Sequence, residues 1–167
     1  MPLTMNNPVD LEILKNAQIL IVDNDRDTQD LYAFLLDSYA AKVTTISSIQ
    51  GALDFLSKFT PTILICEIRF LGESVYPLLQ QIKQIKEDCN RMIPILAVST
   101  CSAMSLADDL RLQIEAYQIK PIDLDQFFDT VWSLVLLSKI TQPFAFQDYL
   151  ANLPQAKHSL NGIKLMA

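Results

Sequence analysis

The stretch that decides the fold is Gln18-Ile-Leu-Ile-Val-Asp23-Asn24-Asp25. Its apolar part is short and unbroken, which is typical of a strand buried on both faces, and acidic residues follow it directly. Three later strand-like runs also end on polar residues, namely Cys66-Glu67, Ser99-Thr100 and Tyr117-Gln-Ile-Lys120-Pro121. If the four strands are parallel, their ends meet at one edge of a sheet and form a small acidic pocket that holds one lysine.

Strand and helix patterns alternate five times along the chain. The β-branched run at 42–46 predicts a second strand, and the runs at 62–66, 94–98 and 114–119 predict the others. Helices are predicted after Asp25, after Ser47 or Ser48, around 75–82, over 102–113 and from Asp123. This alternation predicts an α/β fold, a doubly wound five-stranded parallel sheet in the order 2-1-3-4-5 with helices on both faces.

Apolar spacing predicts which side of each helix faces the sheet. The segment 102–113 has the weakest pattern, and Ser105 with Asp108 is expected to open its helix. The predicted inner faces of the other helices are Leu31, Phe34 and Leu35; Ala52, Phe55, Leu56 and Phe59; Val75, Leu78, Leu79 and Ile82; and Leu124, Phe127, Phe128, Val131, Leu134 and Val135.

The length of 167 residues predicts one domain over 17–138, with an N-terminal extension at 1–16 and a C-terminal extension at 139–167. The C-terminal extension is expected to be a tail or a short helix over 144–153. It either packs on the last helix or frays, or it serves as an arm that binds a partner or forms a dimer. A net charge of −6 without a basic run argues against nucleic-acid binding. The apolar stretches are too short to span a membrane and no secretory signal is recognised, so a cytoplasmic protein is expected.

The three cysteines have no metal-ligand spacing and are expected to be reduced and mostly buried. A redox role for Cys66, beside the predicted pocket, is the alternative.

Together these residues resemble the response regulator receiver domain of two-component phosphorelays, which has the CheY-like, flavodoxin-like fold. The resemblance covers about 17–137 and rests on Ile-Val-Asp23-Asn24, on Pro-Ile-Leu-Ala-Val-Ser99-Thr100 and on Tyr117-x-x-Lys120-Pro121. It implies that a histidine kinase transfers a phosphoryl group to an acid at the end of strand 3. It also implies that acids after strand 1 hold Mg²⁺, while a hydroxyl and a lysine bind the phosphoryl oxygens.

The resemblance assigns a role to each residue at the strand ends. Glu67 takes the phosphoacceptor position, Asp23 and Asn24 the metal position, and Ser99 the switch hydroxyl. Tyr117 is the aromatic residue that turns inward with the hydroxyl, Lys120 is the phosphate-binding lysine, and Pro121 is the candidate for a cis peptide bond.

Two residues depart from the family pattern. Glu67 stands where an aspartate is usual, which moves the carboxylate outward by about 1.5 Å, and such a misplacement costs on the order of a hundredfold in rate. Asn24 stands where an acid usually touches the metal, and an uncharged amide is a weaker Mg²⁺ ligand. Mg²⁺ binding is therefore expected to be possible but weakened, with Asp23 and Asp25 as remaining ligands.

The expected function is a single-domain receiver-like module, not an enzyme, that works in phosphorelay signalling without normal phosphorylation. Glu67 then acts as a fixed negative group beside Lys120, and imperfectly, because it carries one charge where a phosphoryl group carries nearly two. The expected partners are a histidine kinase or a downstream protein, bound through the helix 4–strand 5–helix 5 face or the C-terminal extension. The oligomeric state stays open.

Two other functions remain. One is a genuine Mg²⁺-dependent phosphoacceptor. The other is a flavodoxin-like ligand binder, which is disfavoured because no glycine-rich loop follows strand 1 and the pocket is acidic.

Overall fold

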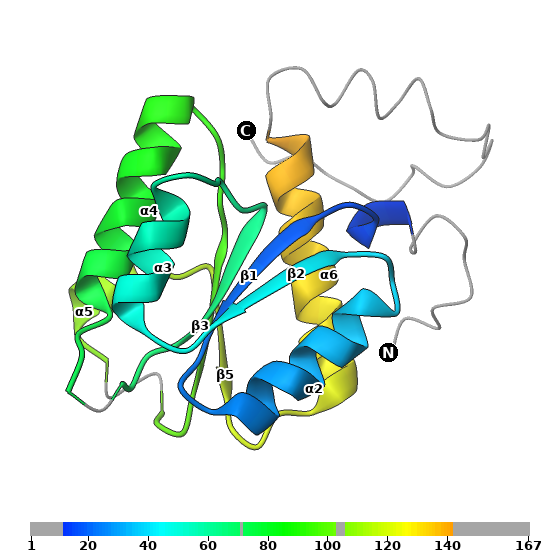
Figure 1. The fold of residues 1–167 in the computed structure, drawn as a ribbon, viewed down its shortest axis with the longest axis horizontal. Coiled ribbons are helices and arrows are strands. Elements are labelled where there is room, and N and C mark those ends of the chain that lie inside the picture. The colour runs from blue at the N-terminus through cyan, green and yellow to red at the C-terminus, as the bar shows by residue number, and fades with distance from the viewer. Residues whose placement is uncertain (1–11, 71, 103–105, 142–167) are drawn as a thin grey trace.

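The computed structural model describes residues 12–70, 72–102 and 106–141, and its elements alternate as the sequence predicts. A helical turn at 12–14 leads into the first strand (Figure 1). The elements are β1 (Gln18–Val22), α2 (Arg26–Asp37), β2 (Lys42–Ile46), α3 (Ile49–Leu56), β3 (Ile63–Glu67), α4 (Tyr76–Cys89), β4 (Ile95–Ser99), α5 (Asp108–Arg111), β5 (Ala116–Ile119) and α6 (Leu124–Ile140).

The five strands form one parallel sheet in the order β2-β1-β3-β4-β5, which confirms the predicted fold class and strand order. The chain winds outward in one direction from β1 to β2 and in the other from β1 through β3 to β5. The point of reversal lies between β1 and β3, so the carboxyl ends of these two strands border the crevice that such sheets use for binding.

Two apolar cores cover the two faces of the sheet. In Figure 1, α2 and α6 lie on one side of the sheet, and α3, α4 and α5 lie on the other. The first core joins Tyr32 and Leu36 of α2 to Phe127 and Val131 of α6. The second joins Leu56 of α3 to the buried face of α4 and to β3 and β4. Burial on both faces explains why β3 and β4 are apolar along nearly their whole length.

Helix starts follow local capping chemistry. Asp25, Ser48 and Asp123 are the N-cap residues of α2, α3 and α6, and each side chain accepts a backbone N–H of the first turn. At the C-terminal end of α4, Asn90 adopts a left-handed conformation with φ of 49°, which ends the helix. The caps at Asp25 and Asp123 fix where α2 and α6 begin, and therefore the lengths of the loops that follow β1 and β5.

The predicted inner faces were partly wrong. In α2, Leu31 is 44% and Phe34 is 79% exposed, because the helix turns Gln29, Tyr32 and Leu36 inward instead. Phe59 is 59% exposed because it lies beyond the end of α3, and Leu124 is 41% exposed because it is the first residue of α6. The inner face predicted for α4 is confirmed, since its four apolar residues are buried.

The helix predicted over 102–113 was too long, because α5 spans only Asp108–Arg111. Its N-cap residue, Ala107, offers no side-chain acceptor, and only Leu110 of the helix is buried. The predicted capping residue Ser105 lies outside the described residues, as does most of the C-terminal extension. Among the described helices, none has the length and apolar character needed to cross a bilayer.

Candidate functional site

Three charged side chains from different strand ends meet at the carboxyl edge of the sheet. The Nζ atom of Lys120 lies 2.7 Å from Oδ2 of Asp23 and 3.0 Å from Oε2 of Glu67. Asp23 and Glu67 are buried, and only 17% of the Lys120 side chain is exposed. One ammonium group therefore bridges two carboxylates that are 44 positions apart in sequence (67 − 23), in the crevice that the sheet topology predicts.

Asp23 is held by its own loop. Its Oδ1 atom accepts the backbone N–H of Asp25 at 2.9 Å, and its backbone carbonyl accepts the side-chain amide of Gln29. The Gln29 amide also donates to the hydroxyl of Ser47 at 3.2 Å. The first turn of α2 thus fixes the Asp23 backbone and leaves Oδ2 for Lys120.

Glu67 has both carboxylate oxygens occupied. Oε1 accepts the backbone N–H groups of Ile68 and Arg69, each at 2.8 Å, and Oε2 accepts from Lys120. The longer side chain therefore curls over the two amides that follow it in the chain. Charge-assisted bonds of this kind are among the stronger hydrogen bonds in proteins, so the carboxylate is firmly positioned.

Lys120 remains charged despite its burial. Burial by itself lowers the pKa of Lys120, but the hydrogen bonds that its ammonium group donates to Asp23 and Glu67 outweigh this effect, and the pKa is raised above its usual value. The backbone N–H of Lys120 donates to the carbonyl of Ser99 at 2.8 Å, which joins β5 to β4 just below the site. The Lys120–Pro121 peptide bond is cis.

Ser99 ends β4 and Tyr117 lies in β5, the two strands beyond β3 in the sheet. The hydroxyl of Ser99 is fully buried, and its oxygen has no hydrogen-bond partner among the described residues. The phenol of Tyr117 donates to the carbonyl of Cys101 in the loop after β4. Burial raises the pKa of Tyr117. The Glu67–Lys120 pair thus makes no hydrogen bond to the predicted switch hydroxyl.

The residues at the position expected to hold Mg²⁺ are uncharged or already engaged by other groups. Asn24 is exposed, and Asp25 accepts from the backbone of Asp27 and the hydroxyl of Thr28 as the cap of α2. Asp23 and Glu67 are already paired with Lys120. Over residues 12–70, 72–102 and 106–141, no group of three or more acidic, histidine or cysteine side chains is arranged to hold a metal ion.

The cysteines only partly match the expectation. Cys66 is fully buried and packs beside the site, where burial raises the pKa of its thiol, so the thiol stays protonated and shielded. Cys89, however, is exposed and Cys101 is half-buried, because they lie at the end of α4 and in the loop after β4. The prediction that most cysteines are buried was therefore wrong.

Two residues near the site were not identified from the sequence. Gln29 anchors the Asp23 loop, and Tyr32 stacks on Phe127 with ring centroids 4.5 Å apart. Burial raises the pKa of Tyr32 to about 12, with the nearby Asp23 and Glu67 charges acting in the same direction. A polar residue at Gln29, about two turns before the core position of Leu36, was a usable signal, since polar residues on an inner helix face require partners.

A family model for the response regulator receiver domain matches residues 19–131, well over half of the chain. The chain belongs to this family. The family and fold predictions are thereby confirmed, and the coarse function is that of a receiver domain in two-component signalling.

Two curated relatives show sequence similarity to this chain. The receiver is 26% identical over 117 residues to the "Uncharacterized 14.6 kDa protein in sodA1 3'region" of Leptolyngbya boryana, covering 68% of this chain and 86% of that protein. It is 31% identical over 126 residues to the "Regulator of RpoS" of Escherichia coli K12, covering 72% of this chain but 35% of that protein. The chain thus matches about a third of the length of the second relative.

Solved receiver structures share the fold. The signal receiver domain of a putative Luxo repressor protein from Vibrio parahaemolyticus aligns with a TM-score of 0.66 at 18% identity, over 81% of this chain and 97% of that one. Full-length FixJ from B. japonicum aligns with a TM-score of 0.63 at 25% identity, over 82% of this chain and 64% of that one.

Proposed function

We propose that this receiver is a protein–protein interaction module that works without phosphorylation, with Glu67 as a permanent negative group paired to Lys120. The observation that carries the proposal is the bridge from Lys120 Nζ to Asp23 at 2.7 Å and to Glu67 at 3.0 Å. The lysine that would bind an incoming phosphoryl group is already engaged by a carboxylate supplied by the chain itself.

The geometry of Glu67 argues against its acting as a phosphoacceptor. A carboxylate that accepts a phosphoryl group must offer a free oxygen in line with the donor, and catalysis depends mainly on this positioning. Both oxygens of Glu67 accept hydrogen bonds, one from two backbone amides and the other from Lys120. Phosphorylation would require breaking at least one of these charge-assisted contacts in a buried setting.

The metal requirement points the same way. Phosphoryl transfer to a receiver depends on a divalent cation to offset the charge on the phosphoryl oxygens. Here Asn24 supplies only an exposed neutral amide, and Asp25 is committed to capping α2. We therefore expect weak Mg²⁺ affinity, and no step of the proposed function requires the ion.

The likeness to a phosphorylated receiver is partial. Glu67 supplies one negative charge to Lys120, and it does not hydrogen-bond to the Ser99 hydroxyl, whose oxygen is buried and unpartnered in the described part of the chain. Glu67 thus makes the contact with Lys120 that a phosphoryl group would make, but not the contact with Ser99. We infer a single fixed state rather than a switch between two states.

Output is proposed through α5, β5 and α6, the face that receivers use for protein contacts. Large apolar side chains are exposed on or next to each of these elements, with Leu112 at 88%, Ile119 at 52% and Leu124 at 41%. Exposed apolar side chains of this size favour a protein partner over a small ligand.

A mass measurement tests the proposal. The wild type, the single variant Glu67→Asp and the double variant with Asn24→Asp are incubated with acetyl phosphate and Mg²⁺, and intact masses are recorded. We expect no added phosphoryl group on the wild type and a base-labile addition on the double variant, since the changes restore the usual acceptor and metal ligand. A stoichiometric, base-labile phosphoryl group on the wild type would contradict the proposal.

That contrary result would favour the second candidate function, a genuine phosphoacceptor. The observation that favours this candidate is the buried Ser99 hydroxyl, which makes no hydrogen bond to the described residues. Such a hydroxyl is free to donate a hydrogen bond to a phosphoryl oxygen. In that case the same assay on an Asp23→Asn variant would test whether Asp23 holds the metal, since loss of the metal ligand should abolish phosphorylation.

A further inference from the structure

Strand β2 is an edge strand of the sheet, and no described segment of the chain pairs with its outer side. It pairs with β1 alone, in parallel, from Gln18 opposite Lys42 to Val22 opposite Ile46. Its sequence, Lys-Val-Thr-Thr-Ile, is β-branched apart from the lysine and contains no proline. Edge strands are usually protected by several charges, a proline or a bulge, and β2 has only Lys42.

The hydrogen-bonding groups of β2 alternate between its two sides. Lys42 donates its N–H to Ala17 at 2.8 Å, and the carbonyl of Ile46 accepts from Asp23 at 3.1 Å, so both residues face β1. Because backbone groups alternate along a strand, Thr44 also faces β1, and the N–H and C=O groups of Val43 and Thr45 point outward. Two outward donors and two outward acceptors lie symmetrically about Thr44.

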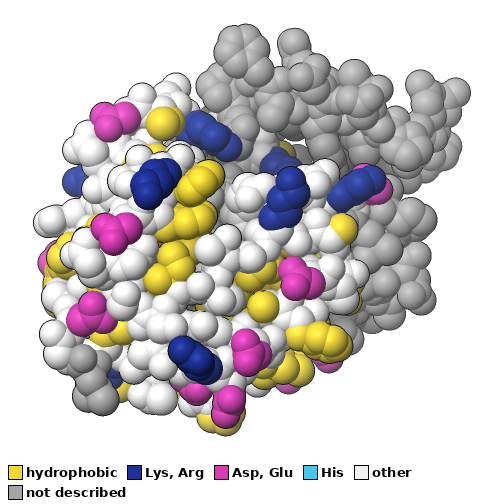
Figure 2. Space-filling view, viewed as in Figure 1, with side chains coloured by type: hydrophobic (Ala, Val, Ile, Leu, Met, Phe, Trp, Pro, Cys, Tyr) yellow, Lys and Arg dark blue, Asp and Glu magenta, His cyan; other side chains and the backbone are white. Residues whose placement is uncertain are grey.

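Apolar side chains are open to solvent next to this edge. Phe55 and Phe59 stack with ring centroids 5.1 Å apart, and Phe59 is 59% exposed. Together with Thr44 and Pro61 they line a groove of about 330 Å³ between the edge of the sheet and the end of α3. Hydrophobic side chains are visible on this face in Figure 2, on the α3 side of the sheet.

We propose that β2 is a self-association site, at which a second copy of the chain adds its own β2 in antiparallel orientation about a two-fold axis through Thr44. In this register Val43 of each copy lies opposite Thr45 of the other, and the pair exchanges both backbone hydrogen bonds. Thr44 lies opposite Thr44 of the other copy in a pair without mutual backbone bonds. The two sheets become one continuous sheet.

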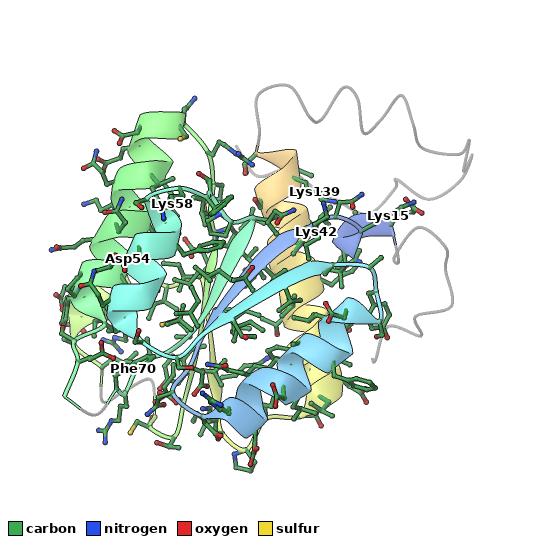
Figure 3. The ribbon with its side chains drawn as sticks, viewed as in Figure 1. Lys15, Lys42, Asp54, Lys58, Phe70 and Lys139 are labelled. Carbon is green, nitrogen blue, oxygen red and sulfur yellow. The ribbon has the colours of Figure 1, made fainter. Side chains whose placement is uncertain are left out.

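The symmetry of β2 favours a second copy over an unrelated peptide. The antiparallel register places Lys42 opposite Ile46 and keeps the two lysines at opposite ends, so like charges do not meet across the interface. Asp54 of α3 and Lys58, which follows the end of α3, carry opposite charges and face outward in Figure 3. A two-fold contact of this kind closes at the dimer and does not continue into a fibre.

Cross-linking across the two-fold axis tests the register. In full-length protein with Cys89→Ser and Cys101→Ser, Thr44→Cys places the two thiols in a pair with Cα atoms about 4.5 Å apart, within disulfide range. The matched control is Thr45→Cys. Its copies are offset by two residues, about 6.8 Å along the strand, and lie beyond disulfide reach.

We expect mild oxidation to give a disulfide-linked dimer for Thr44→Cys and several-fold less for Thr45→Cys. Random collision would favour position 45, because Thr45 is the more exposed of the two. No dimer at position 44, or equal yields at both positions, would overturn the proposed register and with it the proposal.

A second variant tests self-association without new cysteines. Thr45→Pro removes an N–H that points to solvent, which an edge strand tolerates, and it blocks the new hydrogen bonds. By sedimentation velocity, the wild type is expected to shift toward dimer as concentration rises, and the variant to stay monomeric with an unchanged circular dichroism spectrum. A wild type that stays monomeric at every concentration overturns the proposal. Neither result depends on phosphorylation of Glu67, so this test is independent of the proposed function.

Discussion

At the scale of single residues, Lys120 is the group on which the site depends. Its removal leaves Asp23 and Glu67 buried without a counter-charge, and an uncompensated charge in the interior is more harmful than the loss of a surface ion pair. We predict that Lys120→Met lowers the free energy of unfolding by about 3–5 kcal/mol at neutral pH. Urea denaturation followed by circular dichroism measures this loss.

The matched control is Lys15→Met. Lys15 pairs with Glu12 at 3.3 Å, and both side chains are more than half exposed. Such a pair contributes under about 1 kcal/mol. If the two variants lose the same amount of stability, the bridge at the site has no special role and the electrostatic account fails.

Alkaline pH is expected to destabilise the fold through two groups at this site. The pKa of Tyr32 is raised to about 12 and that of Lys120 is raised above its usual value, so both hold their protons more tightly in the folded state than in the unfolded state. Their stabilising contributions are complete below the unfolded pKa values, near 10, and are lost as pH rises through the folded values.

The slope of this loss can be assigned to Tyr32. Between about pH 10 and 12, Tyr32 contributes up to about 1.4 kcal/mol of this loss per pH unit. We predict that Tyr32→Phe makes the free energy of unfolding fall less steeply in this range than it does in the wild type. Denaturant titrations at several alkaline pH values give the comparison, and parallel slopes would refute the assignment.

Residue positions at strand ends were predictable from the sequence, and contacts made by helices were not. The meeting of Asp23, Glu67 and Lys120 follows from parallel strand ends alone. The role of Gln29 depends on the rotation of α2 about its axis, which apolar spacing did not fix. The engagement of both Glu67 oxygens depends on the backbone path after β3, for which the sequence offers no rule.

At the scale of elements, α2 shows how an apolar pattern can mislead. Leu31, Phe34 and Leu35 fit a helical stripe, yet Tyr32 and Leu36 are the apolar residues that α2 fully buries. Of the predicted three, only Leu35 packs against the core, and it is half-buried. The stripe is displaced because Gln29 is drawn inward by its hydrogen bonds to the Asp23 carbonyl and to Ser47. A polar residue with partners can outweigh apolar spacing in setting which face of a helix is buried.

The exposed face of α2 therefore should tolerate substitution. We predict that Phe34→Ser changes the free energy of unfolding by less than about 0.5 kcal/mol, because the side chain is 79% exposed. Leu36→Ala, at a fully buried position, should lower it by about 2–5 kcal/mol. Chemical denaturation of both variants decides the matter, and a large loss for Phe34→Ser would contradict the observed rotation of α2.

At the N-terminus of α2, substitutions of Asp25 distinguish a role in capping the helix from a role in binding metal. Asp25 accepts from the Asp27 N–H at 3.1 Å and from the Thr28 hydroxyl at 2.8 Å. Asn can make the same capping contact without charge, so Asp25→Asn should keep the denaturation midpoint while Asp25→Ala lowers it. If Asp25→Asn is as harmful as Asp25→Ala, the charge of Asp25 has a role that capping does not explain.

At the scale of the whole molecule, the sheet order and the place of the site followed from alternation. Five strand–helix units with right-handed crossovers leave few arrangements, and burial of β3 and β4 on both faces selects a sheet covered on two sides. The edge position of β2 follows from the predicted strand order. The shortness of α5 was not predictable, because it depends on how much apolar surface the neighbouring elements leave uncovered.

The central claim is that Glu67 keeps the Lys120 side of the site permanently occupied. Beryllofluoride with Mg²⁺ imitates an acceptor-bound phosphoryl group, and the backbone amide NMR spectrum reports whether it binds. We predict that the wild-type amide signals of Ser99, Tyr117 and Lys120 do not move on its addition, whereas those of the Glu67→Asp, Asn24→Asp variant do. Saturable shifts of these three signals in the wild type would contradict the account.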